Sequence, residues 1–94
     1  MNVPRATGTF PYDATLSRYA NHIMAGEGTC TLMVNGSATA LAITVTSGMT
    51  GWLVDTTHSV SVVQGDTCAN WIQGSGVTGT TLTWDGAGLR VVAS

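Results

Sequence analysis

The sequence contains no lysine, and charged residues of any kind are scarce. Only 9% of its 94 residues are charged. A soluble domain usually has about 25–35% charged residues on its surface, so Thr, Ser and Gly must solvate what is exposed here. Two interpretations remain open: a Thr-rich monomer, or an oligomer with much of its surface in interfaces. The positive mean hydropathy favours the oligomer.

Basic clusters and long apolar runs are absent as well. The three arginines, Arg5, Arg18 and Arg90, are far apart in the sequence, whereas nucleic-acid binding needs a basic patch. No apolar run is long enough to span a bilayer. We therefore expect no nucleic-acid partner and no membrane. The N-terminal stretch has neither the basic start nor the apolar centre of a signal peptide, which predicts synthesis in the cytoplasm.

No motif for catalysis, cofactor binding or metal binding stands out. Residues 74–79 match the glycine spacing of a dinucleotide-binding loop, but the residues after them predict a strand rather than the required helix. His22 and His58 have no further ligands at a metal-site spacing. Asp55, His58 and a nearby serine on one strand would point to alternating faces and form no triad. We therefore predict no enzyme activity, no cofactor and no metal.

The two cysteines, Cys30 and Cys68, occupy positions where a strand would otherwise have an apolar side chain. A free cysteine behaves as a small hydrophobic residue, and a cytoplasmic origin favours thiols. We predict that the two are unlinked.

Short runs of alternating apolar and small polar residues predict an all-β fold. The clearest run aligns Leu41, Ile43 and Val45 on one face, and Val60 and Val62 align in another. Asn35-Gly36 and Asp85-Gly86 are strong hairpin-turn signals, and residues 21–28 and 47–57 are predicted loops. Seven or eight short strands are expected, which indicates an antiparallel β-sandwich or barrel; the predicted ranges are 14–20, 29–34, 39–46, 58–63, 67–72, 80–84 and 89–93.

Residues 1–13 contain both prolines and no sustained alternation. We interpret them as an extended N-terminal arm that precedes a domain over 14–94; a disordered tail is the alternative. Trp71 and Trp84 are expected in the core. The candidate interface residues come from the arm and from the apolar 47–57 segment: Val3, Phe10, Tyr12, Trp52 and Leu53.

The runs MVNGSATALAITV and DTTHSVSVVQGDT, within Leu32 to Trp71, resemble the globular jelly-roll head found in bacteriophage structural proteins and at the ends of bacterial collagen-like proteins. The resemblance implies a small jelly-roll-type sandwich, a homotrimer without enzyme activity, and display on a particle or cell surface. The chain lacks a collagen-like Gly-X-Y stem, and it is short for an eight-stranded jelly roll. One or two strands are therefore expected to be missing or supplied by a neighbour.

A short head without a stalk, in the light of this resemblance, implies a phage capsid decoration (cement) protein. Such a protein would be made in the host cytoplasm and would bind the major capsid protein on the virion surface as a trimer. Two alternatives stay open: the tip of a tail fibre, and a carbohydrate-binding sandwich module in which Trp52 is the stacking platform.

Overall fold

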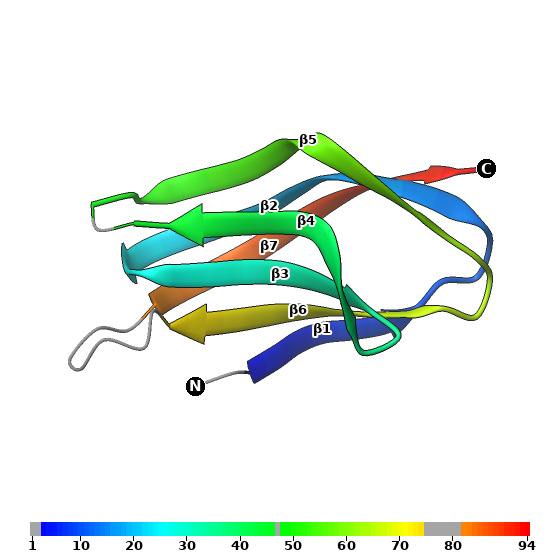
Figure 1. Ribbon diagram of the computed structural model, residues 1–94, viewed down its shortest axis with the longest axis horizontal. Helices are drawn as coiled ribbons and strands as arrows, with labels where there is room; N and C mark the ends of the chain where they lie inside the picture. Colours follow the sequence, from blue (N-terminus) through cyan, green and yellow to red (C-terminus); the bar gives the residue numbers. More distant parts are fainter. Residues whose placement is uncertain (1–2, 47, 75–81) are drawn as a thin grey trace.

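The computed structural model describes residues 3–46, 48–74 and 82–94, with side chains from residue 8 onward. These residues form an all-β sandwich of two antiparallel sheets, with extents of 42 × 22 × 19 Å (Figure 1). They contain no helix that is long and apolar enough to cross a membrane. The strands are β1 (Val3–Thr9), β2 (Ala14–Gly26), β3 (Gly28–Val34), β4 (Ser37–Val45), β5 (Gly51–Val62), β6 (Thr67–Gly74) and β7 (Leu82–Ala93).

One sheet has four strands in the order β1-β6-β3-β4, and the other has three in the order β5-β2-β7. The predicted hairpin between β3 and β4 is confirmed. Its turn residues, Asn35 and Gly36, have φ angles of 52° and 80°. Positive φ at both positions is what a type I′ turn requires, and Asn and Gly tolerate it best.

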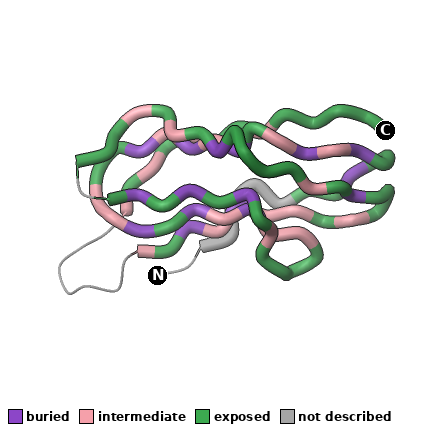
Figure 2. Tube along the Cα trace, turned by 45° about the horizontal axis from the view of Figure 1, so that its top comes forward, coloured by how far each residue is buried: buried purple, intermediate pink, exposed green. Residues whose placement is uncertain are grey.

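The core lies between the sheets, where buried and exposed residues alternate along the strands (Figure 2). The predicted core residues Leu41, Ile43, Val45 and Val62 are buried, and Val60 is partly buried against them. The same cluster contains these further residues: Phe10, Ala14, Leu16, Tyr19, Ile23, Cys30, Leu32 and Ile72.

β2 is longer than predicted, because residues 21–26 continue the strand rather than forming a loop. Its alternation changes phase at Arg18, which has a φ of 51° and lies at a register shift. Leu16 faces the core before this bulge, and Tyr19 and Asn21 face it afterwards. A bulge inserts one residue into the strand and so reverses its pattern, so Tyr19 lies on the core face, where strict alternation from Leu16 would place Arg18.

Two other loop predictions were wrong. β5 begins at Gly51, so most of the predicted 47–57 connection belongs to a strand. β7 runs without a break through Asp85-Gly86, where a hairpin turn was predicted. Its register passes from His22 opposite Gly86 to Ile23 opposite Trp84. Asp85 is therefore the extra residue of a bulge.

The N-terminal segment is part of the sandwich. Val3–Thr9 forms β1, which pairs with β6 as an edge strand of the four-stranded sheet. An arm separate from the sandwich is not confirmed. Trp71 is half-buried and lies on the outer face, because its neighbours Asn70 and Ile72 point inward; its prediction as a core residue was wrong. The glycine-rich residues 75–79 lie outside the described residues.

Candidate binding surfaces

The outer face of the three-stranded sheet carries a row of residues centred on Trp52. Trp52 on β5 lies opposite His22 on β2, and His22 lies opposite Gly86 on β7. The indole and imidazole centroids are 5.2 Å apart, with an angle of 58° between the rings. A Cβ atom on Gly86 would lie 3.3 Å from Cη2 of Trp52. The indole therefore extends over all three strands.

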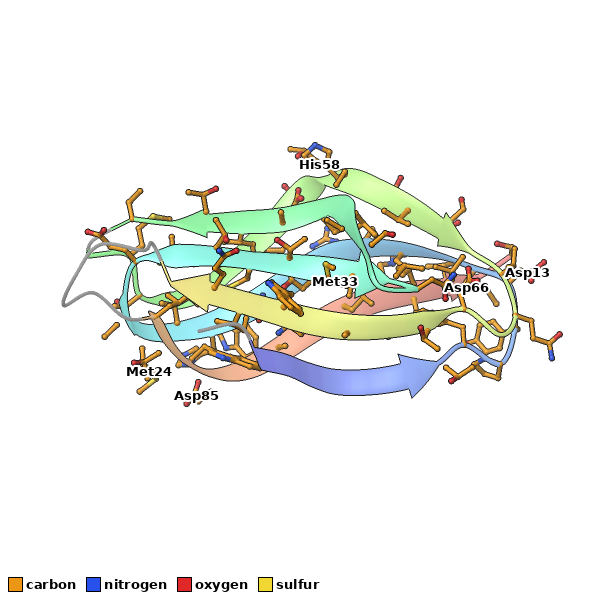
Figure 3. The ribbon with its side chains drawn as sticks, turned by 60° about the horizontal axis from the view of Figure 1, so that its bottom comes forward. Asp13, Met24, Met33, His58, Asp66 and Asp85 are labelled. Carbon is orange, nitrogen blue, oxygen red and sulfur yellow. The ribbon has the colours of Figure 1, made fainter. Side chains whose placement is uncertain are left out.

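A polar pair borders this row. Nδ1 of His22 is 2.5 Å from a carboxylate oxygen of Asp85, the bulged residue of β7. Met24 and Val54 are also exposed, and Met24 and Asp85 lie at the same end of the sandwich in Figure 3. Trp52 is 58% exposed, so the face combines a large aromatic surface with a charged rim.

A second candidate surface lies on the side of the sandwich where β1 and β7 are the edge strands, called here the β1–β7 side. Val91 lies opposite Leu16 in the β2–β7 pair. Opposed residues share a face of the sheet, so Val91 points inward, as the fully buried Leu16 does. Val91 is nevertheless 39% exposed. The interior is therefore not fully covered at this place.

A cavity of about 190 Å³ lies between β6 and β7 on the same side. Most of its wall is apolar, and Tyr19, Asn70 and Cys68 give it polar atoms. The residues that line it are Tyr19, Leu32, Cys68, Asn70, Ala87, Gly88 and Leu89.

Behind the cavity, a chain of buried hydrogen bonds links the two sheets. The Tyr19 hydroxyl donates to Oδ1 of Asn70, and Nδ2 of Asn70 donates to Oδ1 of Asn21 over 2.7 Å. Burial raises the pKa of Tyr19, so the phenol stays protonated and remains a donor. Nδ2 of Asn21 is buried without a partner in the described structure. These hydrogen bonds hold β6 of one sheet against β2 of the other.

On the opposite side, where β4 and β5 are the edge strands, a buried carboxylate joins the sheets. Asp55 on β5 accepts hydrogen bonds from the backbone N–H of Ala42 on β4 (3.3 Å), from the N–H and hydroxyl of Thr57, and from His58 (2.8 Å). Burial alone would raise the pKa of Asp55, but these donors outweigh it and hold the pKa well below its usual range. We call this the β4–β5 side.

The predicted interface residues do not gather on one surface. Trp52 and Tyr12 are exposed, at 58% and 46%, but Tyr12 precedes β2 and Trp52 lies opposite His22. Eight strand residues separate these two points, or roughly 26 Å. Phe10 is buried in the core, and Leu53 is half-buried against it. The backbone of Val3 pairs with Ile72, and its side chain is outside the described part.

The two cysteines are free thiols, as predicted. Cys30 lies opposite Ile72, and Cys68 lies opposite Val34 in the same pair of strands. Four residues of β6, roughly 13 Å, therefore separate the positions, whereas a disulfide needs Cα atoms within about 7 Å. Within the described ranges, no group of three or more His, Cys, Asp or Glu side chains could hold a metal ion.

Sequence reasoning missed His22, Asp85 and Gly86 as neighbours of Trp52. His22 lay in a predicted loop, and Asp85-Gly86 in a predicted turn. The only signal in the sequence is that His22 and Asp85 are polar residues that could continue the alternation of β2 and β7. That alternation changes phase at the bulges, and the sequence does not indicate where the bulges lie.

Comparisons with protein-family models, curated proteins and solved structures found no significant match to this chain.

Proposed function

We propose that this protein is a non-enzymatic assembly protein: a trimeric bacteriophage capsid decoration protein with a sandwich of jelly-roll type. The observation that carries the proposal is the incomplete β1–β7 side, where inward-facing Val91 is exposed beside an apolar cavity. A neighbouring chain that covers this side would complete the core.

The strand order supports a jelly-roll type. A jelly roll is a long antiparallel ribbon that rolls up so that distant strands become neighbours, and it normally has eight strands. Here the ribbon pairs are β3–β4, β2–β5 and β1–β6, and rolling adds the pairs β3–β6 and β2–β7. In this scheme the ribbon partner of β7 would be a strand before β1, and none of the described strands takes that place. The unfilled position is the free edge of β7.

The free edge of β7 suits strand addition by another chain. Among the described strands, β7 has β2 as its only neighbour in the sheet. An extended segment could pair with its backbone and place side chains over Val91 and the cavity, which is β-augmentation. If each subunit covers the β1–β7 side of the next, the contact is heterologous, and it forms a ring when the rotation between subunits closes. A trimer is such a ring.

The near absence of charge supports the same proposal. The chain has three basic and five acidic residues and no lysine. Edge strands of monomeric proteins are commonly protected by charged residues, lysine above all. From Gly86 to Ala93, β7 has Arg90 as its one charged residue, so its edge has little to discourage pairing.

Co-sedimentation with purified phage capsids tests the function. We expect the wild type to bind capsids in a saturable way, and we expect Val91→Lys to bind at least tenfold more weakly, because the lysine ammonium would have to be buried. Val63→Lys is the matched control, since Val63 is 56% exposed after β5 and should leave binding unchanged. A wild-type protein that stays monomeric and ignores capsids at micromolar concentration would refute the proposal.

A further inference from the structure

We propose that the outer face around Trp52 is a binding site for a neutral hexopyranose sugar. The indole of Trp52 stacks on the sugar ring, and the His22–Asp85 pair hydrogen-bonds its hydroxyl groups. The site lies on the outer face of β5-β2-β7, whereas the assembly proposed above uses the β1–β7 side. The two proposals can therefore fail independently.

The indole lies along the sheet. Neighbouring strands are about 4.8 Å apart, and Trp52 on β5 reaches across β2 to Gly86 on β7. Only a ring that extends along the sheet surface can make that contact. The indole reaches Gly86 with its outer edge, and 58% of Trp52 is still exposed, so much of the ring surface is open to solvent. Gly86 makes this possible, since any larger residue would meet the ring.

A flat aromatic surface of this kind matches one face of a sugar. A pyranose has faces of C–H groups, whose slightly positive hydrogens are attracted to the negative face of an indole. Met24 and Val54, at 49% and 45% exposed, add apolar surface on the same strands that carry His22 and Trp52. These contacts explain stacking, but they do not by themselves select a sugar.

The polar His22–Asp85 pair beside the indole favours a sugar over a purely apolar ligand. Nδ1 of His22 and one oxygen of Asp85 bond to each other, while no partner in the described structure bonds Nε2 of His22 or the second oxygen of Asp85. Both remain free for hydroxyl groups, which donate as well as accept. The core of a protein–protein interface is instead depleted of charged residues. The carboxylate of Asp85, 57% exposed, disfavours anionic sugars.

Because Trp52 is 58% exposed, we expect binding to be weak. Pockets for small molecules usually enclose most of the ligand surface, whereas this face can cover only one side of a sugar. We expect dissociation constants in the millimolar range for single sugars.

An NMR titration tests the site in the whole protein. The probes are galactose, glucose, mannose and N-acetylglucosamine. The readout is the indole N–H signals of the three tryptophans, assigned with Trp→Phe variants, together with the backbone N–H signals of His22 and Asp85, which remain in the Trp52→Ala variant. We expect at least one sugar to shift the Trp52 signal saturably. Trp52→Ala should abolish binding. Gly86→Val, which displaces the indole from a strand position that accepts valine, should weaken it at least tenfold.

Trp71→Phe is the matched control, because Trp71 lies on the outer face of the other sheet; it should leave binding unchanged. Melting temperatures would show that each variant is folded. Sugar binding that survives Trp52→Ala, or no saturable shift with any of the four sugars up to their solubility, would refute the site. If Trp52→Ala instead lowers the oligomer mass or capsid binding, the face is a protein interface and the sugar proposal is wrong. Sugar binding without a trimer or capsid binding would refute only the proposed function.

Discussion

The two sides of the sandwich differ in how their edge strands are protected from pairing with another chain. On the β4–β5 side, Asp55 bridges the sheets and accepts a hydrogen bond from the N–H of Ala42, an edge-strand amide. Val45, on β4, is only 2% exposed. On the β1–β7 side, β7 has no such bridge within the described part of the chain, and Val91 is exposed although it faces inward.

This difference indicates on which side the single chain satisfies an edge-strand hydrogen bond by itself. Unpaired N–H groups on an edge strand can pair with another chain. A buried carboxylate that accepts a hydrogen bond from one of these N–H groups makes it unavailable for such pairing. The β4–β5 side is thus closed by the chain itself at Ala42, and we propose that the β1–β7 side is closed by assembly. The predictions below compare the two sides.

A Val→Asp substitution should destabilise the fold strongly on the β4–β5 side and only weakly on the β1–β7 side. Val45→Asp puts an unpaired charge into the closed core, which costs several kcal/mol and should unfold the domain. Val91→Asp places the charge where water already reaches, and in the monomer it should cost about 1 kcal/mol or less. Urea denaturation of both variants in dilute solution measures this. Equal losses would mean that the β1–β7 side is also closed in the single chain.

Removing the bridge should open the closed side. Asp55→Asn keeps the shape but loses the charge that four hydrogen bonds stabilise, and we expect a loss of about 2–3 kcal/mol in the free energy of unfolding. Asp85→Asn is the control, because Asp85 is largely exposed, and it should cost under about 0.5 kcal/mol. Thermal or urea denaturation at neutral pH compares the two.

The same carboxylate predicts an acid sensitivity. The pKa of Asp55 is lowered in the folded state, so its stabilising effect is complete above the unfolded pKa, about 3.9, and is lost as the pH falls below that value. Asp55→Asn should therefore lose less stability than the wild type between pH 5 and pH 2 (about three pH units). Hydrogen bonds from Asn35 and Val63 also lower the pKa of Asp66, so some acid sensitivity should remain. Identical pH profiles would show that Asp55 does not close its side through its charge.

The smallest expected effect concerns the thiols. Burial raises the pKa of the Cys30 thiol to about 11, and Cys30 is fully buried between the sheets. Cys68 lines the cavity on the β1–β7 side and is only partly buried. A thiol reagent should therefore modify Cys68 first in the monomer, and assembly should slow that reaction. Faster modification of Cys30 would argue against the open side.

The sequence was informative where alternation is regular. Leu41, Ile43 and Val45 follow strict period 2, and the Asn35-Gly36 turn has a unique backbone preference, so this hairpin could be predicted. Bulges could not. Arg18 adopts a positive φ, which is rare for arginine. The dipeptide Asp85-Gly86 is typical of a tight turn, although here it lies within a strand.

The candidate sites depend on those bulges. Trp52 was predicted as an interface or ligand-facing aromatic residue in a loop; it is exposed, but it lies in a strand. Its neighbours come from three strands whose registers shift at the bulges, so the row could not be assembled from spacing. The free edge of β7 likewise depends on strand order, which single-sequence patterns do not determine.

Amide hydrogen exchange tests the comparison between the two sides most directly. The amide of Ala42 should be protected in every state, because Asp55 accepts its hydrogen bond within the chain. The amides of β7 that point away from β2 should exchange rapidly in dilute monomer and become protected when the protein assembles or binds capsids. Rapid exchange of those β7 amides in both states would contradict the account, because it would mean that no chain pairs with that edge.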